Sequence, residues 1–192
     1  MPQPTEILKQ EHNAILRMLD AAEALAGRIG SGELPEPELL AGVTEFFELF
    51  LDRCHHGKEE NLFFPVLERK GVAVHGGPIG VMLREHQQGR ELTAAMVEAS
   101  RAYAQGETGA AGRWARAARE HAALLRDHIF KENAVLFPMA EGLLAPAEQD
   151  ALVARFDELE NERMGAGTHE RLHAQMAEIF AQVFGADQPR RL

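Results

Sequence analysis

The stretch His55-His-Gly-Lys-Glu-Glu-Asn-Leu-Phe-Phe-Pro65 decides the fold, because much of it returns as His128-Ile-Phe-Lys-Glu-Asn-Ala-Val-Leu-Phe-Pro138. The copies lie 73 residues apart and share His, Lys, Glu, Phe and Pro at five of eleven positions. Each copy contains the pattern His-x-x-x-Glu, and residues i and i+4 lie on one face of an α-helix. Each copy therefore predicts a helix that presents an imidazole and a carboxylate on the same side.

Apolar residues recur at spacings of three and four along most of the chain, which predicts an all-α protein without a sheet. We expect helices at about 5–29, 36–65, 78–104, 110–137, 144–164 and 168–184. Pro65 and Pro138 should end or kink their helices, since proline lacks a backbone donor. Short turns join the first four helices, so residues 1–141 should form an up-down-up-down antiparallel four-helix bundle. Residues 142–192 should form a C-terminal helical extension packed on or beside the bundle.

The repeat extends to a second pair of histidines, because Glu11-His12 is matched by Glu85-His86. Each half of the bundle then has one histidine, followed 42 or 43 residues later by His-x-x-x-Glu. At a rise of about 1.5 Å per residue, counting from the helix ends places all four histidines level to within about one turn. The candidate metal ligands are His12, His55, Glu59, His86, His128 and Glu132.

These side chains suit two metal ions, with two imidazoles per ion and two carboxylates that bridge. Each ion then has four protein donors, which leaves an octahedral ion one place for a bridging water or hydroxide and one for an exogenous ligand. Mixed nitrogen and oxygen donors with open positions favour iron or manganese. Without metal, burying the same side chains would be costly. A structural interpretation, in which the histidines are only part of the core, predicts that Glu59→Ala and Glu132→Ala leave the metal content unchanged.

With each glutamate followed by Phe-Pro after a short spacer, this pattern resembles the hemerythrin-like (HHE cation-binding) family over about residues 5–140. Gly76-Gly-Pro-Ile79, Arg84-Glu-His86 and the run at 162–167 resemble longer bacterial members that have an added C-terminal helical segment. The resemblance implies a non-haem di-iron centre with an oxo or hydroxo bridge, for which manganese or zinc can substitute. It also implies a role in oxygen carriage, oxygen or iron sensing, iron handling or peroxide turnover.

Two departures argue against a simple oxygen carrier. Oxygen carriers of this family have two histidines four residues apart on the third helix, whereas here Arg90 follows His86 at that spacing. Their fourth helix has His-x-x-x-x-Asp, whereas here it has His-x-x-x-Glu. We therefore expect a di-iron protein that binds or reacts with O2 or peroxide, with catalase- or peroxidase-like chemistry if it is an enzyme. The alternative is a non-catalytic iron or oxygen sensor or storage protein that signals through its C-terminal helices.

Composition limits the partners and the location. The formal net charge of −10 over 192 residues argues against a nucleic-acid or anionic membrane surface. The single cysteine, Cys54, excludes an internal disulfide. We recognise no signal peptide at the start and no apolar run of the roughly 20 residues that a membrane span needs, so we expect the cytoplasm. The sequence leaves the oligomeric state open, with a dimer as one option.

The remaining histidines and lysines have ordinary interpretations. His56 and Glu60 also have the i, i+4 spacing, but Ile129 and Asn133 replace them in the second copy, so we expect them in solvent or supporting the ligands from outside. His121 is too far along its helix to bind the same metal, and should be a core histidine or a proton donor near the site. We expect His75 exposed, His169 and His173 on a solvated face, and Cys54 buried. Lys58 and Lys131 should lie at the surface by default, and the alternative is that they pair with neighbouring carboxylates.

Overall fold

The computed structural model describes residues 3–165 and 167–185, and every regular element in these ranges is a helix. The all-α prediction is therefore confirmed. In chain order the elements are α1 (Pro4–Gly30), α2 (Pro37–Phe46), η1 (Phe47–His55), α3 (His56–Lys58), η2 (Glu59–Phe63), α4 (Phe64–Arg69), α5 (Pro78–Ala104), α6 (Ala110–Lys131), η3 (Glu132–Leu136), α7 (Phe137–Leu143), α8 (Pro146–Met164) and α9 (Thr168–Phe184). The elements labelled η are π-helical.

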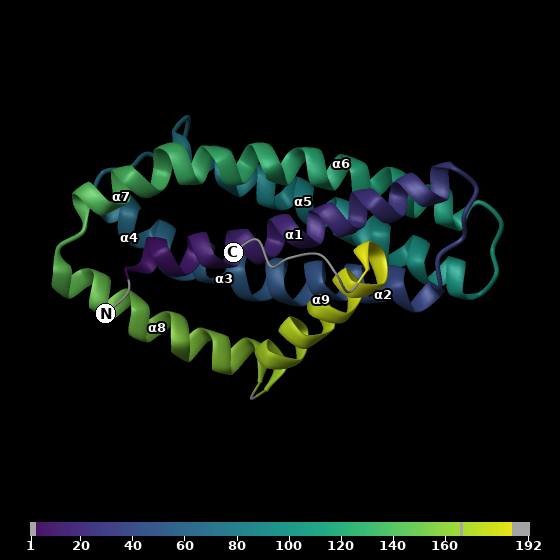
Figure 1. Cartoon of the computed structure of the whole chain (residues 1–192). Helices are drawn as coiled ribbons and strands as arrows, with labels where there is room; N and C mark the ends of the chain where they lie inside the picture. Colours follow the sequence, from purple (N-terminus) through teal and green to yellow (C-terminus); the bar gives the residue numbers. More distant parts are fainter. Residues whose placement is uncertain (1–2, 166, 186–192) are drawn as a thin grey trace.

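Four long rods form the bundle, and they run alongside one another in Figure 1. The first rod is α1, the second runs from α2 to α4, the third is α5, and the fourth runs from α6 to α7. Neighbouring rods contact each other along α1 and α6, α5 and α6, and α2 and α5. Gly71 ends the second rod with a φ of 93°, a left-handed conformation that favours glycine, and the next N–H, that of Val72, donates to the carbonyl of Leu67.

Neither Pro65 nor Pro138 ends its rod, and the fourth rod continues past the expected end to Leu143. Each proline follows a π-helical stretch. The N–H of Phe64 donates to the carbonyl of Glu59, and the N–H of Phe137 donates to that of Glu132, five residues back in each case. The hydrogen-bond pattern has therefore already shifted before the proline, whose missing donor is tolerated at the start of the next α-helical segment.

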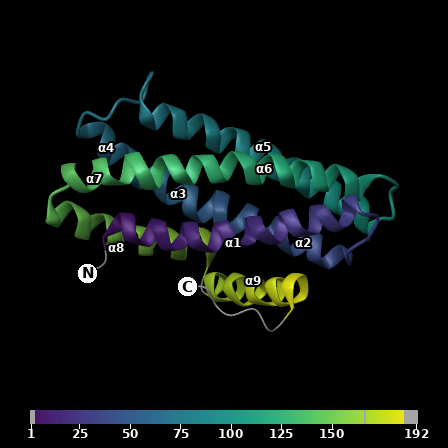
Figure 2. The same cartoon turned by 45° about the horizontal axis from the view of Figure 1, so that its top comes forward.

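The C-terminal helices pack on one side of the bundle, where α8 contacts η1, α3 and η2, and α9 contacts α1 and α2 (Figures 1 and 2). The side chain of Phe156 on α8 is buried, and so are Leu172 and Ile179 on α9. Arg171 and Gln175 of α9 also bond to Glu45 on α2. The predicted extension over 142–192 includes residues 166 and 186–192, which lie outside the described part of the chain.

Two hydrophobic clusters fill the bundle, one on each side of the candidate ligands. The larger cluster contains Leu51 and Leu125 and surrounds Trp114, whose indole N–H donates to the hydroxyl of Thr44 at 3.0 Å. The smaller cluster contains Phe63 and Phe137 together with Phe156 from α8. Because His12 and His55 lie between these clusters in sequence, the polar residues form one layer between two apolar ones. Such a layer has little contact with bulk water.

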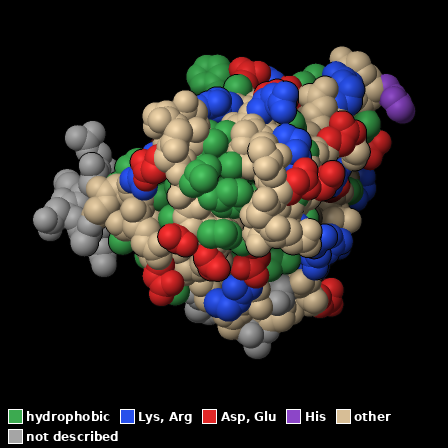
Figure 3. Space-filling model, turned by 90° about the vertical axis from the view of Figure 1, so that its right-hand side faces the viewer, with side chains coloured by type: hydrophobic (Ala, Val, Ile, Leu, Met, Phe, Trp, Pro, Cys, Tyr) green, Lys and Arg blue, Asp and Glu red, His purple; other side chains and the backbone are tan. Residues whose placement is uncertain are grey.

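No helix within residues 3–165 and 167–185 is long and apolar enough to cross a membrane. Figure 3 shows the end of the bundle that includes the turns between α1 and α2 and between α5 and α6. Acidic and basic side chains alternate there with hydrophobic and uncharged ones. This end therefore presents no large field of one sign.

Candidate metal centre

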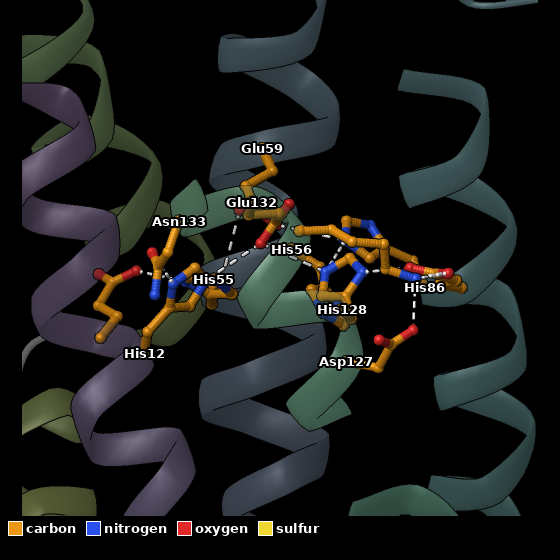
Figure 4. A network of polar contacts seen from close by, with 12 residues as sticks. His12, His55, His56, Glu59, His86, Asp127, His128, Glu132 and Asn133 are labelled. Carbon is orange, nitrogen blue, oxygen red and sulfur yellow. Dashed lines mark hydrogen bonds and ion pairs between the residues drawn. The ribbon is translucent and has the colours of Figure 1, made fainter. Parts of the chain in front are cut away.

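The six predicted ligands come from all four rods and meet in the middle of the bundle (Figure 4). His12 lies on α1, His86 on α5 and His128 on α6, and His55 is the last residue of η1. Glu59 and Glu132 are the first residues of η2 and η3. At most 1% of each of the six residues is exposed. The structure thus brings together every residue that the repeat singled out.

The imidazoles form two pairs, one from each half of the repeat. The ring centroids of His12 and His55 are 4.7 Å apart, and those of His86 and His128 are 4.8 Å apart. Glu59 places Oε1 3.5 Å from Nε2 of His55 and Oε2 3.3 Å from Nε2 of His86. Glu132 places Oε2 3.1 Å from Nε2 of His12 and 3.3 Å from Nε2 of His128. Each carboxylate therefore faces one imidazole of each pair, as bridging would require.

The other ring nitrogen of each ligand histidine has an oxygen partner. Nδ1 of His55 lies 2.8 Å from Oε2 of Glu11, and Nδ1 of His128 lies 2.9 Å from Oε2 of Glu85. Such acceptors hold the proton on Nδ1, so the lone pair of Nε2 points to the centre. The arrangement orients both rings as metal ligands.

The remaining two ligand histidines are oriented in the same way by residues that directly follow the glutamates. Nδ1 of His86 lies 2.7 Å from Oε1 of Glu60, and Nδ1 of His12 lies 3.0 Å from Oδ1 of Asn133. The sequence pattern did not predict this role for Glu11, Glu85 or Asn133. Their signal was position, since each is adjacent in sequence to a predicted ligand.

A lysine in each half binds the glutamate that orients a histidine. Lys58 pairs with Glu11 and, at 2.6 Å, with Glu160 of α8, while Lys131 pairs with Glu85 and, at 2.9 Å, with Asp127. The expectation of a surface position is wrong for Lys58, which is 1% exposed because α8 covers it. Burial alone would raise the pKa of Glu11, but its hydrogen bond from His55 and the Lys58 ammonium lower that pKa to about 2.

We expected His56 either in solvent or supporting the ligands from outside. The solvent-exposed alternative is wrong, since the residue is 0% exposed. Its ring stacks on that of His86, with centroids 3.8 Å apart and an angle of 17° between the planes. The spacing of apolar residues along the second rod predicts a single buried face. Both α5 and α8 cover this rod, however, so more than one of its faces is buried. The π-helical segments on either side of α3 also shift the helical register. Glu60 does support a ligand, as described above.

The site fits metal ions because its charges lack other partners. None of the four carboxylate oxygens of Glu59 and Glu132 has a hydrogen-bond partner among the described residues. Burial, together with the charge of Glu132, raises the pKa of Glu59 well above its ordinary value. A buried carboxylate pair facing imidazole lone pairs is costly without cations, and the nitrogen and oxygen donors suit first-row transition metals.

His121 is a core histidine away from the centre. It is 0% exposed, its Nε2 lies 3.4 Å from Oγ1 of Thr93, and its ring packs against Phe47. Burial lowers its pKa to about 4, so the ring is neutral at pH 7. Cys54 is also fully buried, and burial raises the pKa of its thiol to about 12.

Of the two C-terminal histidines, the structure describes the side chain of His173. His173 packs its ring against Phe50, with centroids 5.7 Å apart. The side chain of His169 lies outside the described residues, so the solvated face expected for both histidines is described only at His173, which is half-buried. His75 is exposed in its loop, as expected.

Comparison with known proteins gives matches over most of the chain. The family model of the hemerythrin HHE cation-binding domain matches residues 3–140. Rv1995, an uncharacterized protein of Mycobacterium tuberculosis, is 24% identical over 174 residues, which are 91% of this chain and 68% of the relative, and a Mycobacterium bovis protein gives the same values. The iron-sulfur cluster repair protein DnrN of Neisseria gonorrhoeae is 31% identical over 140 residues, which are 68% of this chain and 85% of that protein.

Proposed function

Because this chain belongs to the hemerythrin HHE cation-binding family, we propose that its buried layer of histidines and glutamates holds two iron ions that react with O2 or peroxide. His12 and His55 would hold one ion, His86 and His128 the other, and both glutamates would bridge. The observation that supports this most is the pair of buried carboxylates: both oxygens of Glu59 and Oε2 of Glu132 face imidazole nitrogens, and no oxygen of either has a hydrogen-bond partner among the described residues. Iron is favoured over manganese and zinc because the relative DnrN is named for iron-sulfur cluster repair.

The residues around the centre prepare it for redox chemistry. Acceptors on Nδ1 fix all four imidazoles before any ion binds, which avoids reorganisation later. The apolar clusters above and below exclude bulk water, which strengthens every electrostatic interaction in the layer. The residues His12, His55, Glu59, His86, His128 and Glu132 would hold two ferrous ions, which would supply two electrons to a small oxidant. The biological role would then be oxygen or iron sensing, or defence against oxidants.

The test is an iron count and a visible spectrum of protein loaded with ferrous iron without air, taken before and after O2 is admitted. We expect two irons per chain and an oxygen-dependent band. A band that disappears when O2 is removed supports reversible binding, whereas rapid passage to a ferric oxo-bridged spectrum supports turnover. Glu59→Ala and Glu132→Ala should each reduce the iron content, while the exposed Glu98→Ala should retain it. Wild-type protein without iron would refute the proposal.

A second candidate is a sensor that signals through the C-terminal helices. It is favoured by a chain of contacts from His55 through Glu11 and Lys58 to Glu160, which lies on α8. A change in the iron site that moves His55 would reach α8 through these contacts. Limited proteolysis with and without iron tests this candidate. It predicts that cleavage within residues 142–192 changes on iron or O2 binding, and unchanged cleavage would argue against it.

A further inference from the structure

His56 is a buried histidine that the ligand set does not use. One of its ring nitrogens belongs to a group of potential ligand atoms from Glu59, His86 and His128 that lie within 4.8 Å of one another. Neither of its nitrogens has a hydrogen-bond partner among the described residues, although Nδ1 lies 3.2 Å from Oδ1 of Asp52. Nδ1 therefore faces Asp52, and Nε2 remains for the centre.

The stacking of His56 on His86 determines whether Nε2 of His56 can bind the same metal ion as His86. A metal ion lies in the plane of the imidazole that binds it, and rings stacked 3.8 Å apart at 17° have no such point in common. In this arrangement His56 is therefore not a second ligand of the ion on His86. Since Nδ1 faces Asp52, Nε2 is the nitrogen that we assign to the group within 4.8 Å of the ligand atoms of Glu59, His86 and His128.

An ionised Asp52 favours the proton of the neutral imidazole on Nδ1, which leaves Nε2 as a hydrogen-bond acceptor. Asp52 also lines a surface pocket of about 540 Å³ together with Glu60, Arg90 and Thr93, so His56 stands between this pocket and the centre. The second copy has no such group, because Ile129 takes the equivalent position. The two halves of the centre are therefore chemically unequal.

We propose that His56, oriented by Asp52, accepts a hydrogen bond from an exogenous ligand beside His86 and so selects ligands that have an O–H group, such as hydrogen peroxide. The inference rests on the proposed two-iron centre and deepens it by naming the ligand class. Azide and other anions without a proton gain nothing from this acceptor. A single hydrogen bond is worth about 0.5–1.5 kcal/mol, and a factor of ten corresponds to about 1.4 kcal/mol, so the selectivity should be several-fold and at most about tenfold.

The test compares two reactions of the iron-loaded full chain at pH 8, above the pKa of Asp52, which burial raises to about 7. The first is oxidation of the diferrous protein by hydrogen peroxide. One H2O2 takes two electrons from two ferrous ions and two protons from solvent, its O–O bond breaks, and two waters form. The second is azide binding to the diferric protein, followed as a dissociation constant by its visible absorption band.

His56→Ile copies the residue of the second half, and Ile129→Val is the control for a change in core packing. We expect His56→Ile to slow the peroxide reaction several-fold and to leave azide binding equal or tighter, with Ile129→Val changing neither. Asp52→Asn keeps His56 in place but can donate to Nδ1 and turn Nε2 into a donor. It should therefore tighten azide binding.

The outcomes distinguish a failure of the proposed two-iron centre from a failure of the role proposed for His56. Wild-type protein that binds fewer than two irons overturns the proposed centre and this inference with it. Suppose that every variant binds two irons. If His56→Ile then leaves the peroxide rate and the azide affinity unchanged, or weakens both by the same factor, only the role of His56 is overturned. If His56→Ile does not fold, an unchanged azide affinity in Asp52→Asn overturns that role.

Discussion

Replacing Lys58 with methionine tests the difference in burial between the two halves of the centre. The side chains of Lys58 and Glu11 are 2% and 8% exposed, and the ammonium contacts both Glu11 and Glu160. Methionine preserves most of the apolar stem but removes the charge. Glu11 is then left as a buried carboxylate, with His55 as its remaining partner at 2.8 Å.

The equivalent change in the other half is Lys131→Met, which serves as the matched control. The Lys131 side chain is 31% exposed, and one of its two partners, Asp127, is 72% exposed. Breaking a buried ion pair on one side costs about 3–5 kcal/mol, whereas an exposed pair contributes about 0–1 kcal/mol. We therefore expect Lys58→Met to lower the free energy of unfolding by at least about 2 kcal/mol more than Lys131→Met does.

The assay is urea unfolding of the metal-free protein at pH 7, followed by helical circular dichroism and extrapolated to water. Metal is removed so that changes in iron affinity do not enter the comparison. Equal losses in the two variants would show that α8 does not isolate Lys58 from water. A loss below about 1 kcal/mol for Lys58→Met would show that its ion pairs contribute no more than surface pairs do.

Three further predictions concern the core. The pKa of His121 in the folded protein, about 4, lies below the ordinary 6.5, so the contribution of this residue to stability is full above pH 6.5 and is lost as pH falls through 4. Over that range the wild type should lose about 3 kcal/mol more free energy of unfolding than His121→Leu does, and parallel pH profiles of the two proteins would contradict this. Phe137→Ala should cost about 3–5 kcal/mol in urea unfolding because its buried ring stacks on His12, whereas Phe130→Ala, at a 67% exposed position, should change little, and a similar cost for both would refute the packing argument. Trp114→Phe should cost about 1–3 kcal/mol by removing the hydrogen bond to Thr44, and a double-mutant cycle with Thr44→Val that shows no coupling would exclude that bond as the cause.

The sequence predicts the bundle, and the six candidate ligands that the structure brings together within it, because both depend on one repeated pattern. His55 and Glu59 are i and i+4 on a helix, and their counterparts His128 and Glu132 repeat this 73 residues later. The third helix, predicted at 78–104, begins and ends at Pro78 and Ala104. Proline and glycine signals at helix ends are local, so the chain itself contains the information.

The positions that sequence analysis missed depend on contacts between distant segments. Lys58 is buried because Glu160 lies 102 residues away in sequence and packs over it on α8. His56 is buried because α5 brings His86 against it. A helical periodicity identifies the most apolar face of a rod, but it does not reveal that a second or third rod covers the polar faces as well.

Comparing the two copies of the repeat shows which differences follow from α8. Gly57 and Phe130 are equivalent positions, and Phe130 is 67% exposed. A Cβ atom at Gly57 would lie 3.3 Å from Arg163 and 3.6 Å from Leu159, both on α8. A side chain as large as phenylalanine at Gly57 would therefore meet α8, the helix that places Glu160 on Lys58. Within residues 3–165 and 167–185 no helix covers the equivalent face of the second copy to the same extent, since the ring of Phe130 is exposed there. Glycine in one copy and phenylalanine in the other thus mark, in the sequence itself, which half of the metal centre lies beneath the C-terminal helices.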